Sequence, residues 1–271
     1  MSEICEVSAP ADIFDATMGG LEGGLHVAHI ATFDLKTCEA TDEADLVLRN
    51  PSLEGFDQIP VRRKGQVVGV LHRFPMPLRG QAEERMVALG DSFLVSADAP
   101  LMSYIRIAAS APYRLVVDGT GITGIVTRSD MLKLPVRVLA FALVTHLEMM
   151  MVQVIRSRCG SDDETWLQRL SEGRRKKTLE KLEVFKKKKM NPPLLELTEF
   201  CDKRDVVAER VAPGRDFLHE LEGIEELRNS VAHAATYANN DDEVRVFVER
   251  MLSAERWIDV LRDRACSEAT V

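Results

Sequence analysis

The chain has 271 residues, and 45% of them are hydrophobic, which is enough to bury the core of one large domain or of two medium ones. Its formal net charge of -8 excludes attraction of the whole molecule to nucleic acid through its overall field, so any RNA contact must be local. The five cysteines are widely spaced, odd in number and never arranged as CxxC, which argues against a disulfide framework and against a zinc site.

Residues 1–134 are rich in glycine, proline and β-branched residues. The first twelve are acidic and polar, without an apolar stretch of the signal-peptide kind, so a cytoplasmic location is expected. Residues 58–73 predict a β-hairpin that turns at Lys64-Gly65. The same pattern returns at residues 113–127, with a glycine turn at 119–121.

Helices are expected on both sides of the second hairpin. Asp98 can cap a helix over residues 101–108, and Ser129-Asp130 can start another. The order strand, helix, strand, strand, helix and the repeated hairpin together indicate two paired modules that share a core.

After Pro135 the pattern becomes helical, and we place a domain boundary between residues 134 and 135. The apolar run 138–144 is short and soon followed by His146 and Glu148, which predicts a buried helix and no membrane span. The fold class is therefore α+β, with paired repeats over 1–134 and an all-helical bundle over 135–271. The predicted helices cover residues 136–158, 164–170, 174–189, 194–207, 217–237 and 242–262.

The end of the second hairpin, GIVTRSD at residues 124–130, resembles the end of a CBS repeat, where a hairpin leads into a T-x-x-D step. A hydroxyl and free N–H groups at a helix start suit a phosphate, and a carboxylate three residues later can accept ribose hydroxyls. The resemblance implies that Thr127 contacts phosphate and Asp130 contacts ribose of an adenine nucleotide, AMP, ADP or ATP, as a regulatory ligand. The alternative is that Ser129-Asp130 only caps a helix.

The first repeat departs from this pattern. His72 and Pro75 stand where the second repeat has Thr127 and Asp130. Without the ribose carboxylate, the first repeat is not expected to bind a nucleotide in the family manner, so at most one of the two clefts does.

The string EELRNSVAHA at residues 225–234 resembles the R-N-x-x-x-H signature of HEPN domains, which lies near the start of a late helix. The resemblance covers most of residues 136–262. It implies a metal-independent endoribonuclease that needs no catalytic cofactor and leaves a 2′,3′-cyclic phosphate and a 5′-hydroxyl end. In this chemistry His233 takes the 2′-hydroxyl proton, Arg228 stabilises the phosphorane charge, and Asn229 orients the substrate or partner.

Helix geometry constrains the assembly of this site. At about 100° per residue, Arg228 and His233 lie about 140° apart around one straight helix, so a single helix does not focus both on one phosphate. HEPN ribonucleases use a composite site from two protomers. A homodimer with the segment 228–233 at its interface is therefore predicted.

A basic segment adds to the RNA hypothesis. Residues 174–189 contain nine Lys or Arg against Glu180 and Glu183, so they can steer RNA phosphates or form a solvated helical face.

Two other functions stay open. The chain can be a non-catalytic nucleotide-sensing adaptor dimer, or a toxin-type HEPN protein controlled by an antitoxin-like protein partner.

Overall fold

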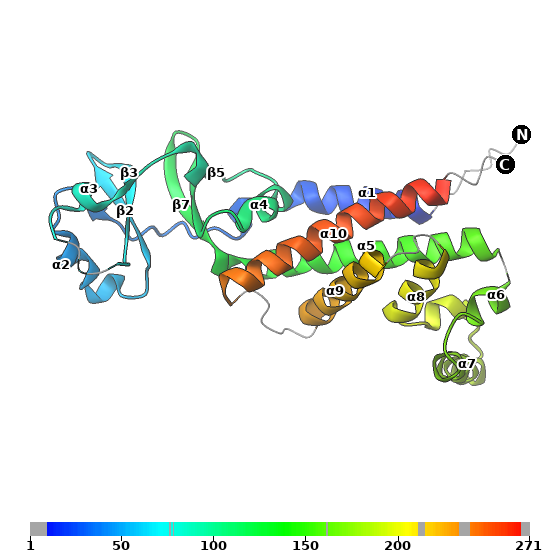
Figure 1. Cartoon of the computed structure of the whole chain (residues 1–271). Coiled ribbons are helices and arrows are strands. Elements are labelled where there is room, and N and C mark those ends of the chain that lie inside the picture. The colour runs from blue at the N-terminus through cyan, green and yellow to red at the C-terminus, as the bar shows by residue number, and fades with distance from the viewer. Residues whose placement is uncertain are drawn as a thin grey trace, which may run out of the picture. The chain divides into compact units, whose positions relative to one another are not determined.

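The computed structural model describes residues 10–75, 77, 79–160, 162–210, 215–232 and 239–266. The chain forms two compact units (Figure 1). Gly23–Pro135 is the repeat unit, and the residues up to Glu22 together with those from Val136 onward are the helical unit. The α+β class is confirmed, because one unit contains the sheets and the other is helical.

The repeat unit contains two sheets of similar design. In each sheet, a short strand pairs in parallel with the first strand of an antiparallel hairpin. The first sheet has the order β1-β2-β3-β4 and the second has the order β5-β6-β7. The strands are β1 (Cys38–Glu39), β2 (Gln58–Arg63), β3 (Gln66–His72), β4 (Val87–Ala88), β5 (Leu94–Ser96), β6 (Tyr113–Asp118) and β7 (Gly121–Thr127). The helices of this unit are α2 (Ala44–Leu48), α3 (Ala82–Arg85) and α4 (Leu101–Ala108), with short 3-10 turns between them.

Both hairpins carry the same irregularity, which supports an internal duplication. The register shifts between Val61 and Arg62 in the first hairpin and between Val116 and Val117 in the second, 55 positions later. The core is also shared, because Val70 from the first hairpin packs with Tyr113 and neighbouring residues of the second. The predicted repetition with a common core is therefore confirmed.

The repeats exchange short strands. Val87, which precedes the second repeat, pairs with Val70 in the hairpin of the first. Thr32, which precedes the first repeat, pairs with Ile125 in the hairpin of the second. Each repeat thus completes the sheet of the other, and the two fold as one unit.

Two glycines permit this exchange. A Cβ atom on Gly69 would lie 2.6 Å from the carbonyl oxygen of Val87, and one on Gly124 would lie 3.0 Å from that of Thr32. A side chain at either glycine would push the exchanged strand away, so the sequence needs glycine at both positions.

The helical unit is built from seven α-helices and one 3-10 helix in the part of the chain that the structure describes. α9 packs against α8 and α10, and α7 contacts η5. Figure 1 shows α10 extended beside α5 and α7 at the periphery of the unit. The elements are α1 (Pro10–Gly24), α5 (Leu134–Cys159), α6 (Asp163–Leu167), α7 (Glu172–Lys187), η5 (Leu194–Leu197), α8 (Phe200–Arg210), α9 (Arg215–Ala232) and α10 (Asp241–Cys266).

The structure differs from the sequence predictions in one domain boundary, one helix cap and one helix. The predicted boundary put the first residues with the repeats, but residues 10–22 form most of α1 and group with the helical unit. Asp98 does not cap α4, whose N-cap is Pro100 without a side-chain hydrogen bond. The helix predicted over 194–207 is divided into η5 and α8, because Thr198 has an extended backbone.

One described helix, α5, is long and apolar enough to cross a membrane by length and composition. More than half of its most apolar stretch is buried inside the protein. The core helix of a soluble protein passes the same test, so the cytoplasmic location stays a prediction.

Candidate functional site

The Thr127–Asp130 step lies at the end of β7, where the 3-10 helix η4 (Arg128–Leu132) begins. Asp130 is buried, and its Oδ2 accepts hydrogen bonds from the backbone N–H (2.6 Å) and the hydroxyl (3.0 Å) of Thr127. Its Oδ1 lies 2.6 Å from Nζ of Lys133, which also donates to the carbonyl of Ile30. The N-cap is therefore Thr127, two residues before the predicted Ser129, and the side chains of Thr127 and Asp130 bind each other.

The equivalent position of the first repeat is packed against the second repeat. Nε2 of His72 lies 3.2 Å from the hydroxyl of Tyr113, and their rings are in contact. Burial lowers the pKa of His72 and raises that of Tyr113 to about 12, so both groups stay neutral at physiological pH. The next residue, Arg73, is buried and donates to the carbonyls of Leu48, Leu53 and Phe56.

Of the three residues predicted to act on RNA, the structure describes two. Arg228 is in α9 with a side chain that is 40% exposed, and Asn229 beside it is exposed. His233 lies outside the described residues, one position beyond the end of α9. The motif was expected near the start of its helix, but Arg228 is four residues from the end of an 18-residue helix.

Arg228 belongs to a chain of charges that joins three helices. Its Nε lies 3.7 Å from Oε2 of Glu148 in α5. The other carboxylate oxygen of Glu148 lies 2.9 Å from Nζ of Lys203 in α8, and this lysine is buried. A buried ammonium needs a counter-ion, so the pairing with Lys203 fixes the carboxylate of Glu148, which also faces Arg228.

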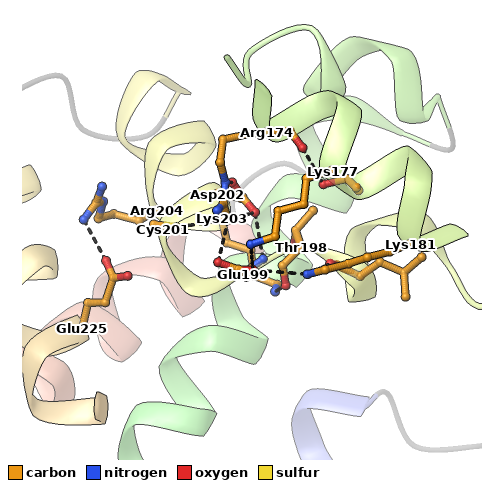
Figure 2. A network of polar contacts seen from close by, with 12 residues as sticks. Arg174, Lys177, Lys181, Thr198, Glu199, Cys201, Asp202, Lys203, Arg204 and Glu225 are labelled. Carbon is orange, nitrogen blue, oxygen red and sulfur yellow. Dashed lines mark hydrogen bonds and ion pairs between the residues drawn. The ribbon is translucent and has the colours of Figure 1, made fainter. Parts of the chain in front are cut away.

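A second group of charges holds α7 against α8 (Figure 2). Arg174 binds the buried carboxylate of Asp202 at 2.6 and 2.7 Å and Glu199 at 2.9 Å. Lys177 and Lys181 bind Glu199 as well, at 2.7 and 3.3 Å. Hydrogen bonds from Lys177 and then Arg174 lower the pKa of Glu199 to about 2.

This arrangement divides the basic segment predicted to meet RNA. Its inner cations Arg174, Lys176, Lys177 and Lys181 pair with carboxylates of the protein itself, and Arg175 donates to the carbonyl of Gln168. At its end, Lys186 pairs with Glu183, whereas Lys187, Lys188 and Lys189 are exposed and form no ion pair with a described residue. Exposed lysines without a described ion pair therefore cluster at and just after the end of α7.

The sequence interpretation named Glu148 only as a polar residue of the long apolar helix, and it missed Lys203. A signal for Lys203 was present, because it follows Phe200 by three residues and precedes Val207 by four, and both are buried. A lysine on the apolar face of a helix indicates a buried ion pair.

His146 is buried, as expected for a core histidine. Its Nε2 lies 3.0 Å from a carboxylate oxygen of Asp15 in α1, which also binds Arg262 of α10 at 2.8 Å. This contact attaches α1 to the helical unit. Within the described ranges, no three His, Cys, Asp or Glu side chains gather as metal ligands.

Comparisons with known proteins concern the repeat unit. No protein-family model matches the chain, and no curated protein matches it. Several solved structures of CBS domains are similar to 40–45% of it.

Three of these structures illustrate the similarity. The CBS domain of a bacterial CNNM/CorC family Mg2+ transporter in complex with ATP is 18% identical, with a TM-score of 0.36, over 45% of this chain and 93% of that one. CBSX2 in complex with AMP is 16% identical, with a TM-score of 0.37, over 42% and 98%. The CBS domains of a transcriptional regulator from Streptococcus pneumoniae are 21% identical, with a TM-score of 0.34, over 40% and 98%.

Proposed function

We propose that the chain is a nucleotide-regulated, metal-independent endoribonuclease of the HEPN type. In this proposal the helical unit cleaves RNA with Arg228 and His233, and the repeat unit binds an adenine nucleotide through Thr127 and Asp130. The observation that carries it is the state of Arg228. Its guanidinium is partly exposed and is held at one edge by a carboxylate that also neutralises a buried lysine. A cation held in this way is ready to meet a phosphate.

The proposed reaction uses only groups of the chain. His233 removes the proton of the 2′-hydroxyl, the 2′-oxygen attacks phosphorus, and the bond to the 5′-oxygen breaks. The departing 5′-oxygen takes a proton from the imidazolium that His233 has become, while Arg228 stabilises the charge on the phosphorane. Asn229, exposed beside Arg228, orients the RNA or the partner protomer. The products are a 2′,3′-cyclic phosphate and a 5′-hydroxyl end.

The active form in this proposal is a homodimer. Arg228 and His233 lie about 140° apart on a straight helix, so each active centre takes Arg228 from one protomer and His233 from the other.

The experiment is incubation of the purified protein with total RNA in EDTA, with and without AMP, ADP or ATP. We expect cleavage in EDTA and a loss of about 10² or more in each of the variants Arg228→Ala and His233→Ala. A mixture of the two variants should recover part of the activity, because mixed dimers contain one complete composite centre. No recovery of activity in the mixture would argue against the composite site. Full activity in each variant would exclude both catalytic roles.

The second candidate is a non-catalytic adaptor or a toxin-type protein held by a partner. The observation in its favour is that the contact between Arg228 and Glu148 also joins α9 to α5, which is a structural role that needs no RNA. A wild-type protein that binds a nucleotide but cleaves no RNA would support this candidate.

A further inference from the structure

Among the described residues, Arg228 pairs with a carboxylate at one edge of its guanidinium. The 3.7 Å separation between its Nε and Oε2 of Glu148 is longer than a hydrogen bond of about 2.7–3.2 Å, so the contact is electrostatic. Among the residues that the structure describes, no other carboxylate pairs with Arg228 at ion-pair distance. The two terminal Nη groups, which form the flat fork that recognises phosphate, are therefore left for a ligand.

Glu148 is held from the other side. Its Oε1 accepts a hydrogen bond from Nζ of Lys203 at 2.9 Å, and the same Nζ donates to the carbonyl of Thr198 at 2.9 Å. The side chain of Lys203 is 4% exposed, so this ammonium cannot turn to water. Figure 2 shows Lys203 and Thr198 within the polar network of α8. The orientation of Glu148 is thus set by a buried partner.

The balance of charge matters as well. One carboxylate lies between two cations, so the group of Lys203, Glu148 and Arg228 carries a net charge of +1. A pair of Glu148 with Arg228 alone would be neutral and would attract a phosphate weakly. Because Lys203 neutralises part of the negative charge of Glu148, Arg228 still attracts an anion. Glu148 meanwhile fixes the direction of the Arg228 guanidinium.

We propose that Glu148, anchored by Lys203, is a positioning residue that holds the Nε edge of Arg228 and directs its Nη edge toward an RNA phosphate. This inference rests on the proposed function, because it gives Arg228 its role in RNA cleavage. It adds that α5 and α8 build the support of the site, whereas the motif itself lies in and after α9.

The variants must separate positioning from stability. Glu148→Gln keeps the shape but leaves Lys203 buried without a counter-ion, so it can unfold the protein. The double variant Glu148→Gln with Lys203→Met removes both charges at similar volume and avoids this cost. Glu196→Gln is the matched control, because it breaks an ion pair between Arg156 of α5 and η5 that does not involve Arg228.

We expect the double variant to fold and to lower the turnover of RNA cleavage about tenfold or more. In the Arg228→Ala background the same change should have no further effect, because the residue to be positioned is absent. The NMR signal of the Arg228 Nε–H group should show a restrained side chain in the wild type and a mobile one in the double variant. The control should match the wild type in each measurement.

The NMR measurement distinguishes the proposed RNA cleavage from the positioning of Arg228 by Glu148. If the wild type cleaves no RNA but the double variant frees Arg228, the proposed function fails and the positioning of Arg228 stands. If Arg228 is as restrained in the double variant as in the wild type, or if the cleavage losses simply add in the Arg228→Ala background, Glu148 does not position Arg228.

Discussion

Buried charges in the helical unit occur as pairs that join different helices. Lys203 of α8 binds Glu148 of α5, and Asp202 of α8 binds Arg174 of α7. Removal of one member leaves a buried charge without compensation, which costs about 3–5 kcal/mol, whereas removal of both costs much less. Single substitutions at these positions therefore test stability before they test function.

His146 allows a test of pH dependence. Burial lowers its pKa more than Asp15 raises it, and Arg262 and Asp259 of α10 are the other charged groups that act on it. The folded state then binds fewer protons than the unfolded state, so stability is complete above about pH 6.5 and falls as the pH drops below it. His146→Gln should remove this loss in urea unfolding followed from about pH 7.5 to pH 5.

The control is His219→Gln, because His219 is exposed and on the surface of α9. The control should lose stability as steeply as the wild type. An equally steep loss in His146→Gln would show that other groups cause the acid sensitivity.

Lys133 allows a test of the nucleotide site. Its ammonium pairs with Oδ1 of Asp130, and the proposed function has this carboxylate bind a ribose. Lys133→Gln removes the competing charge and should strengthen AMP binding about tenfold or more, as measured by calorimetry, because a charge-assisted hydrogen bond contributes about 1.5–3 kcal/mol. Lys36→Gln, which breaks an exposed pair with Asp34 in the same unit, should leave the affinity unchanged. Weaker binding to Lys133→Gln would assign Lys133 to the nucleotide itself.

At the scale of elements, the sequence predicted what its own local pattern determines. Both hairpins and α5 were found because their turns and periodicities are long enough to recognise. The strands β1 and β4 have two residues each and exist only because a hairpin accepts them, so no periodicity could reveal them. α1 was missed because it contains four glycines, which disfavour a helix, and it depends on contacts such as that of Asp15 with His146.

The candidate sites followed the same rule. Thr127 and Asp130 were found as a motif because they are only three positions apart, but their mutual hydrogen bonds and the contact with Lys133 needed the structure. Glu148 and Lys203 are 55 positions apart, and only the packing of α8 on α5 brings them together. The role of His233 stays a prediction.

The division of α7 into a paired inner face and a free end gives a test of RNA binding. Replacement of Lys187, Lys188 and Lys189 by glutamine should weaken RNA binding, because these side chains are exposed. The slope of log affinity against log salt should become flatter by about 2, since each phosphate contact to a single strand contributes about 0.7. Lys176→Gln, on the same helix but paired with Glu180, is the control and should change the slope little. An unchanged slope in the triple variant would make the end of α7 a solvated face.

At the scale of the whole molecule, the repeat unit is an insertion in the helical unit. The chain leaves the helical unit after Glu22, at the end of α1, and returns to it at Val136, at the start of α5. Two covalent connections therefore join the units. In the second connection α5 begins at Leu134, four residues after Asp130, so the Thr127–Asp130 step is close in sequence to the start of α5.

Flexible insertions can locate the connection that carries regulation. Three residues, Gly-Ser-Gly, placed after Lys133 would loosen the connection to α5, and the same insertion after Gly24 would loosen the connection from α1. We expect AMP to change the RNA affinity of the wild type by about 5- to 150-fold, the usual scale of a coupling free energy of 1–3 kcal/mol. The insertion after Lys133 should abolish this change while AMP still binds, because the ligand no longer acts on α5. The insertion after Gly24 should preserve the change. RNA and AMP binding are measured on the wild type and on both insertion variants. If the effect of AMP on RNA affinity persists with the insertion after Lys133, or is lost only with the insertion after Gly24, the effect is not transmitted through the connection between Asp130 and α5.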